Sequence, residues 1–200
     1  MLYYIIVILA ILPFLIIFPI IVRGRKNMPK GKMLFCCNHQ SNWDVLLIAA
    51  KIPGRRFYFM SKESLFKNKF CSFILKKLGA YPVSRNKTDI SAIKKTLSLL
   101  KDEKAICLFP EGARLKTEDS NELRDGAIIF ALKSKAPIVP ACFIKKPKPF
   151  CFNKLIIGKP FNLSEMEEFK EKKITVELIE KGREILRKKM FGLYNQNIKK

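Results

Sequence analysis

Histidine is almost absent from this sequence, since the 200 residues contain a single one, His39. Without CxxC pairs or a second histidine, the six cysteines do not complete a zinc site. Most of them lie inside apolar runs, which predicts buried, reduced thiols of a cytosolic domain. The sequence therefore favours a fold that is held together by an apolar core rather than by metal ions or disulfides.

Acidic residues are also scarce, because 17 Asp and Glu stand against 39 Lys and Arg, a formal net charge of +22. Such an excess favours an anionic partner, either a lipid surface or nucleic acid. A non-functional explanation of the same charge is an AT-rich genome, which increases the content of Lys, Ile and Asn. No helix-turn-helix, zinc-finger or RNA-recognition signature accompanies it, so we expect anionic membrane lipids and no nucleic acid as partners.

Charged side chains are missing altogether from the run Leu2 to Val22. As a helix this run would extend about 31 Å at about 1.5 Å per residue, enough to cross a bilayer. It lacks the basic start and the small-residue cleavage site of a removable signal peptide. Pro13 and Pro19 would kink such a helix, so a shallow helix or a re-entrant pair in one leaflet is the alternative.

Basic residues follow this run at once, from Arg23 to Lys32. By the positive-inside rule they place the rest of the chain on the cytoplasmic side. We therefore expect residues 1–23 to anchor the protein in the cell membrane and residues 24–200 to form one domain that faces the cytoplasm.

Strand-like and helix-like segments alternate beyond Gly31. The strand pattern is found at residues 33–37, 56–60, 80–84, 105–109, 138–143 and 154–157. The helix pattern is found at residues 43–50, 65–77, 89–100, 123–134 and 164–189. Ser164 and Glu167 fit a capping box for the last helix, and residues 145–149, KKPKP, read as a surface loop. The alternation predicts an α/β fold with a mixed, largely parallel sheet flanked by helices, behind an N-terminal membrane helix.

The single histidine lies in a place that chemistry can use. His39 follows the first predicted strand of the domain, and Asp44 falls in the first turn of the next helix, where the helix dipole favours a carboxylate. From there Asp44 can accept the Nδ1 proton of His39 and leave Nε2 free to act as a general base. A surface histidine beside a helix-terminal aspartate would show the same spacing, so spacing alone leaves both readings open.

Several blocks of sequence narrow this choice. They are NHxxxxD at residues 38–44, SKESLF at 61–66, GAYPVSR at 79–85, FPEGAR at 109–114 and PIVP at 137–140. On these blocks, which occur in the family's order, the chain resembles the glycerolipid acyltransferases, the family of lysophosphatidic acid acyltransferase. The sequence departs from the family pattern at Ala113 and Asp125. Those changes leave the acyl-transfer centre intact and bear on the choice of acceptor.

The resemblance implies a membrane-bound O-acyltransferase of phospholipid biosynthesis. It would move a fatty acyl group from acyl-CoA or acyl carrier protein to the sn-2 hydroxyl of 1-acyl-sn-glycerol-3-phosphate, giving phosphatidic acid. His39 would be the base and Asp44 its orienting group, with no metal or cofactor besides the thioester co-substrate. The residues implied for the acceptor phosphate are Lys62, Arg85, Glu111, Gly112 and Arg114.

Three alternatives stay open at this point. In the first, the enzyme acylates another lysolipid or glycerol phosphate. In the second, the protein is a non-catalytic lipid-binding protein of the membrane surface. In the third, Cys37 would form a thiol acyl-enzyme, because positions i and i+2 of a strand face the same side. Packing of Cys37 in the core is the simpler interpretation of that residue.

Overall fold

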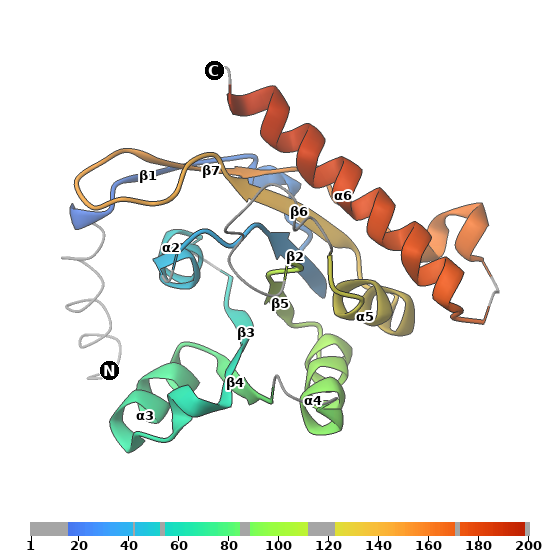
Figure 1. The fold of residues 1–200 in the computed structure, drawn as a ribbon, viewed down its shortest axis with the longest axis horizontal. Coiled ribbons are helices and arrows are strands. Elements are labelled where there is room, and N and C mark those ends of the chain that lie inside the picture. Colours follow the sequence, from blue (N-terminus) through green and yellow to red (C-terminus); the bar gives the residue numbers. More distant parts are fainter. Residues whose placement is uncertain are drawn as a thin grey trace.

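The computed structural model describes residues 16–41, 43–52, 55–84, 89–111, 123–170 and 173–198. A seven-stranded sheet in the order β1-β7-β6-β2-β5-β3-β4 forms its centre (Figure 1). The strands are β1 (Ile20–Arg23), β2 (Met33–Cys37), β3 (Phe57–Lys62), β4 (Ala80–Val83), β5 (Ala105–Leu108), β6 (Ile138–Phe143) and β7 (Asn153–Ile157). The α-helices are α2 (Trp43–Lys51), α3 (Lys69–Lys77), α4 (Ile90–Lys101), α5 (Gly126–Ser134) and α6 (Val176–Ile198), and the 3-10 helices are η1 (Arg25–Asn27), η2 (Glu63–Phe66), η3 (Leu163–Glu165) and η4 (Glu167–Phe169).

Neighbouring strands are parallel throughout the sheet except for β6 and β7, which are antiparallel. The predicted α/β fold with a mixed, largely parallel sheet is therefore confirmed. Strands β2 and β6 have the bounds that the sequence predicts for them, and every residue in both is buried. Strands covered on both faces are apolar at every position rather than at alternate ones, which explains why these two were recognisable.

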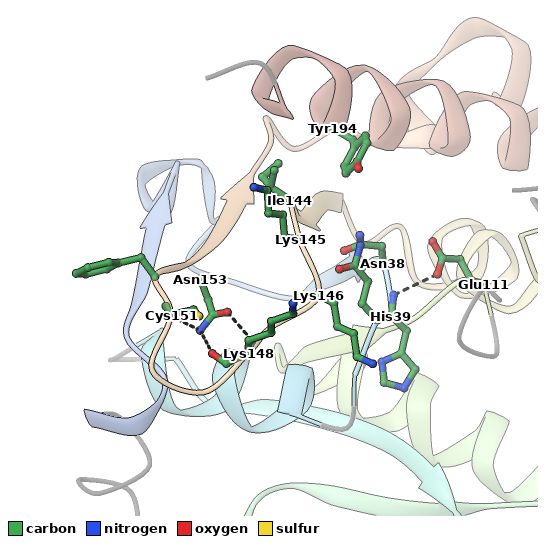
Figure 2. A pocket seen from close by; sticks show the side chains of 12 residues that line it. Asn38, His39, Glu111, Ile144, Lys145, Lys146, Lys148, Cys151, Asn153 and Tyr194 are labelled. Carbon is green, nitrogen blue, oxygen red and sulfur yellow. Dashed lines mark hydrogen bonds between the residues drawn. The ribbon is translucent and has the colours of Figure 1, made fainter. Parts of the chain in front are cut away.

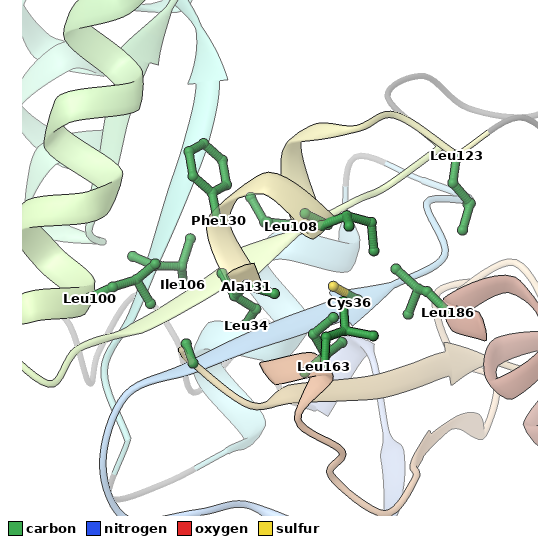
Figure 3. Packing of buried hydrophobic residues seen from close by; sticks show 14 of the residues in the cluster. Leu34, Cys36, Leu100, Ile106, Leu108, Leu123, Phe130, Ala131, Leu163 and Leu186 are labelled. Carbon is green, nitrogen blue, oxygen red and sulfur yellow. The ribbon is translucent and has the colours of Figure 1, made fainter. Parts of the chain in front are cut away.

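Helices cover the two faces of the sheet, as the side chains of β2 show. Leu34 and Cys36 belong to the cluster under α4, α5 and α6, whereas Met33, Phe35 and Cys37 belong to the cluster under α2. Successive side chains of a strand point to opposite faces, so one apolar strand supplies both cores. Figure 3 shows the first cluster around β2, β5 and α5.

The N-terminal edge of the sheet corrects the predicted anchor segment. Residues 20–23, predicted as the end of a membrane helix, form β1 and pair in parallel with β7. Just before them, the carbonyls of Ile17 and Pro19 accept hydrogen bonds from the backbone N–H groups of Phe150 and Asn153. The prediction placed this boundary wrongly because an apolar run is as suitable for a protein core as for lipid.

The rest of the predicted anchor, residues 1–15, lies outside the described residues. Most of the predicted N-terminal membrane helix therefore falls on residues that the structure does not describe. Within the ranges that the structure describes, no helix combines the length and the apolar character needed to span a bilayer.

The last helix also differs from its prediction, because α6 begins at Val176 and not at Ser164. The predicted capping box of Ser164 and Glu167 does not form. Instead, the side chain of Asn162 accepts the backbone N–H of Ser164 and starts the short helix η3. Burial of Leu163 and Phe169 holds this stretch in two short 3-10 turns, so core packing overrides the local capping signal.

Parallel strands end at the same edge of a sheet, and β2, β3, β4, β5 and β6 all run in the same direction here. In such sheets ligands bind outside the carboxyl ends of the strands. The glycine of the block GAYPVSR serves the sheet itself: Gly79 has a φ of 91° and lies so close to the carbonyl of Phe57 that any side chain would collide.

Candidate active site

His39 and Asp44 meet in the loop that joins β2 to α2. The Nδ1 of His39 donates to Oδ2 of Asp44 over 2.9 Å. The same carboxylate oxygen accepts the backbone N–H groups of Gln40 at 2.7 Å and Ser41 at 2.8 Å. The Asp44 side chain is 0% exposed and that of His39 is 17% exposed. The structure thus places the two side chains in the predicted contact, which leaves Nε2 of the imidazole as the nitrogen able to accept a proton.

The local sequence explains why this loop closes on itself. Ser41 is buried, and its hydroxyl accepts the backbone N–H of Trp43, the first residue of α2. Asp44 follows in the first turn, where the helix dipole and two loop N–H groups favour its carboxylate. The position of the imidazole is therefore set by residues within a single short segment.

Two residues from the end of β5 complete the surroundings of His39. The ring of Phe109 stacks on the imidazole with 4.3 Å between centroids. The side chain of Glu111 accepts the backbone N–H of His39 over 3.2 Å. Burial raises the pKa of Glu111, and the hydrogen bond from His39 partly opposes that rise. Both residues belong to the block FPEGAR, so the structure brings this block and NHxxxxD together.

Backbone N–H groups in the loop after β2 are the kind of donor that stabilises an oxyanion in acyl transfer. Those of Gln40 and Ser41 are taken up by Asp44, and that of His39 is taken up by Glu111. These three groups are therefore not available to a reacting carbonyl in this conformation. They act instead as fixed donors that hold the two carboxylates in place.

A pocket of about 990 Å³ opens in front of His39. Figure 2 shows Glu111 and His39 on one side of it and the loop between β6 and β7 on the other. The pocket is lined by Asn38, His39, Gln40, Glu111, Ile144, Lys145, Lys146, Lys148, Cys151, Phe152, Asn153 and Tyr194. Its size lies at the upper end of the range usual for small-molecule sites.

The other predicted site residues fall into two groups. Lys62 is the exposed last residue of β3, at the same sheet edge but outside the lining of this pocket. Arg85, Gly112 and Arg114 lie outside the described residues, so their role at an acceptor phosphate stays a prediction. Among the described residues, no group of three His, Cys, Asp or Glu side chains is placed to hold a metal ion.

Cys37 is badly placed for a thiol acyl-enzyme. Its side chain is fully buried in the core cluster below α2, and burial raises the pKa of the thiol well above its ordinary value. A reactive cysteine needs an accessible thiolate. The block PIVP leads into β6 and contributes no residue to the pocket lining.

Sequence reasoning missed how the β6–β7 loop joins the site. Asn38 bridges to it, because its Nδ2 donates to the carbonyl of Phe143 at 3.0 Å and its Oδ1 accepts the N–H of Phe143 at 2.8 Å. The lysines of KKPKP, read as a plain surface loop, line the pocket. The available signal was a basic run directly after a predicted strand of a sheet that was expected to be largely parallel.

The comparisons with known proteins define the class. The family model described as Acyltransferase matches residues 19–144, which is more than half of the chain. The chain therefore belongs to the acyltransferase family, as the sequence blocks predicted.

Individual relatives narrow the class further. The chain is 32% identical over 161 residues to the 1-acyl-sn-glycerol-3-phosphate acyltransferase of Bacillus subtilis (strain 168), covering 76% of this chain and 78% of that protein. It is 28% identical over 145 residues to the enzyme of the same name from Streptococcus pneumoniae, covering 68% of this chain and 52% of that protein. We assign the chain to the O-acyltransferases on this basis.

A solved structure shares the fold. The 1-acyl-sn-glycerophosphate (LPA) acyltransferase of Thermotoga maritima superposes with a TM-score of 0.66 at 22% identity, covering 90% of this chain and 73% of that one. At this level of identity the likeness supports the α/β architecture, with its mostly parallel sheet flanked by helices.

Proposed function

We propose that this protein transfers a fatty acyl group from an acyl thioester to the sn-2 hydroxyl of 1-acyl-sn-glycerol-3-phosphate, giving phosphatidic acid. The observation that carries the proposal is the pairing of His39 with the buried Asp44 at the mouth of a pocket. The names of the relatives supply the acceptor. Acyl-CoA and acyl carrier protein are the two donors that the mechanism accommodates.

The reaction follows from the orientation of the imidazole. Nε2 of His39 takes the proton from the acceptor hydroxyl as its oxygen bonds to the thioester carbonyl carbon. Asp44 stabilises the imidazolium through the 2.9 Å contact at Nδ1. When the tetrahedral intermediate collapses, the C–S bond breaks and the leaving thiolate takes the proton back from Nε2. The products are an ester and a free thiol, and we propose that no cofactor takes part.

The acceptor phosphate would bind on the side of the site where Lys62 ends β3. Arg85 and Arg114, which the family resemblance assigns to this phosphate, would add bidentate guanidinium contacts. If they do so, Arg→Ala changes weaken the use of phosphate-bearing acceptors more than that of phosphate-free lysolipids. Arg→Lys changes then recover only part of the loss, because an ammonium group cannot make the paired contact.

We propose that the reaction takes place at a membrane surface, with the domain on the cytoplasmic side. Helix α3 supports the surface location, because it buries none of its residues and leaves Phe70 and Phe73 73% and 59% exposed. The last turn of the same helix carries Lys76 and Lys77. Exposed aromatic rings beside lysines are typical of helices that lie in the interface of anionic bilayers.

The test is to offer the purified full-length chain, in detergent, both donors and a panel of acceptors, with the lipid products identified by mass spectrometry. We expect phosphatidic acid from 1-acyl-sn-glycerol-3-phosphate, and no product above background from His39→Ala. Product from glycerol phosphate or another lysolipid alone would replace the proposed acceptor. Binding of lysolipids without any acyl transfer would identify a non-catalytic lipid-binding protein.

A further inference from the structure

The loop between β6 and β7, residues 144–152, lies at the same sheet edge as His39. Strands β2 and β6 are paired in parallel, so both carboxyl ends meet there. Asn38 ties the two loops together through its two hydrogen bonds to the backbone of Phe143. The base of the β6–β7 loop is thus fixed directly beside the catalytic histidine.

The far end of this loop is also held in place. The buried side chain of Asn153 accepts the N–H of Lys148 over 2.9 Å and donates to the carbonyls of Lys148 at 3.1 Å and Cys151 at 2.9 Å. It reaches the carbonyl of Pro19 at 3.2 Å as well. The backbone is therefore set before any ligand arrives, which lowers the entropic cost of binding to it.

Three lysines of this loop, Lys145, Lys146 and Lys148, are exposed and line the pocket. None of them forms an ion pair with a carboxylate in the part of the chain that the structure describes. The one acidic side chain of the pocket lining, Glu111, is engaged with the backbone of His39. The rim thus presents positive charge that no described acidic group balances, as a phosphate-binding surface does.

The order of the strands separates this surface from the expected acceptor site. Starting from β2, the sheet continues to β5, β3 and β4 on one side and to β6 and β7 on the other. Lys62, at the end of β3, lies on the first side, and the three lysines, which follow β6, lie on the second. Acyl transfer brings the hydroxyl and the leaving sulfur to the same carbonyl carbon from two different substrates, so two approaches to His39 are needed.

We propose that Lys145, Lys146 and Lys148 bind the phosphates of the thioester donor, which means the phosphopantetheine arm shared by coenzyme A and acyl carrier protein. This rests on the proposed acyl transfer and adds where the donor binds. The arm would run along the pocket from the lysines to His39 and place the thioester at Nε2. Lysine suits such a site because its ammonium group is a point charge on a flexible stem, which can contact the phosphates of a mobile arm in several orientations.

The test compares two triple variants of the full chain that lose the same charge. Lys145→Gln, Lys146→Gln and Lys148→Gln are combined in the loop variant. The control variant combines Lys94→Gln, Lys95→Gln and Lys101→Gln, at exposed positions of α4. KM is measured for acyl-CoA, acyl carrier protein and 1-acyl-sn-glycerol-3-phosphate, and binding of free coenzyme A and of holo acyl carrier protein is measured by calorimetry.

We expect the loop variant to raise KM for the thioester about tenfold, because each exposed charge contact changes affinity by roughly two- to fivefold. KM for the acceptor should stay unchanged, and the control variant should behave as the wild type. Binding of both calorimetric probes should weaken by the same factor as KM, and the single change Lys146→Gln should show a smaller loss of the same kind.

Four results would overturn the donor site. The first is a rise in acceptor KM alone, which would move the acceptor phosphate to this loop. The second is an equal effect in both triple variants, and the third is unchanged binding of both probes. The fourth is weaker binding to phosphatidylglycerol vesicles with donor KM unaffected, which would make the loop a membrane contact. Calorimetry does not depend on turnover. If the wild type bound coenzyme A but transferred no acyl group, and the loop variant bound it more weakly, the proposed acyl transfer would be refuted while the donor site would stand.

Discussion

The two loops that border the pocket meet at Phe143 but are built in opposite ways. In the loop of His39, one carboxylate oxygen of Asp44 receives the imidazole and two backbone N–H groups. In the loop of Lys145, the backbone is pinned by Asn153 while the charged ends stay in solvent. The groups proposed to react are thus held by several hydrogen bonds, whereas the lysines proposed to bind the donor keep their charge exposed to solvent.

The largest effect should come from Asp44→Asn, which keeps the shape of the side chain and removes its charge. We expect kcat to fall about a hundred- to ten-thousandfold, the usual contribution of general-base catalysis, because the imidazolium loses its partner. The double variant with His39→Ala should be no worse than His39→Ala alone, since the two side chains act as one unit. Steady-state kinetics and circular dichroism check this, and near-wild-type turnover of Asp44→Asn would contradict the assigned role.

Asn38→Ala should separate the two loops. It removes both hydrogen bonds of Asn38 to the buried backbone of Phe143, whose carbonyl keeps only the longer contact with Gln40 at 3.5 Å. We therefore expect a loss of about 1 to 3 kcal/mol in the free energy of unfolding. Because even a small displacement of His39 from its reacting position slows catalysis, kcat should also fall about ten- to a hundredfold.

The matched control for that change is Asn162→Ala, which removes a hydrogen bond of the same type to Ser164 away from the pocket. Denaturant unfolding and kinetics on both variants decide the outcome. If Asn38→Ala changed stability but not kcat, the bridge would be structural only, and the two loops would not be coupled in catalysis.

Glu111, which contacts the loop of His39, should make the stability of the protein depend on pH. Burial raises its pKa, so the folded protein keeps the proton of Glu111 up to a higher pH than the unfolded chain does. Its contribution to stability is fully present below the pKa of the unfolded chain and is lost as the pH rises through the higher folded pKa. We therefore expect the unfolding midpoint of the wild type to fall relative to that of Glu111→Gln across this window. Parallel pH profiles for the two proteins would mean that Glu111 keeps an ordinary pKa.

The smallest effect concerns the cysteines and tests the lysine loop directly. Cys71 and Cys151 are exposed, whereas burial raises the pKa of Cys36 to about 12 and that of Cys142 to about 12. N-ethylmaleimide should therefore modify Cys71 and Cys151 and spare the buried thiols. Coenzyme A should slow the modification of Cys151, which lines the pocket, but not that of Cys71. Peptide mass spectrometry over time gives both rates, and equal slowing at the two sites would argue against local binding.

Elements with strong local signals could be predicted from the sequence, and those that depend on distant partners could not. Strand β6 was recognisable because both its faces are buried, whereas β1 was assigned to a membrane helix because lipid and core select the same residues. The start of α6 was misplaced because Ser164 and Glu167 satisfy a capping pattern, while buried Leu163 and Phe169 prevent the helix.

The same division applies to the site. The sequence by itself determined the pairing of His39 with Asp44, because a strand end, a short loop and a helix start bring them together within five positions. Only the tertiary structure decided that Glu111 accepts the N–H of His39 and that Asn38 bridges to Phe143, across 72 and 105 positions. The physical reason is that such contacts depend on the order of strands in the sheet, which brings β5 and β6 to either side of β2. That order follows from how the whole chain buries its apolar faces and is not written in any short segment.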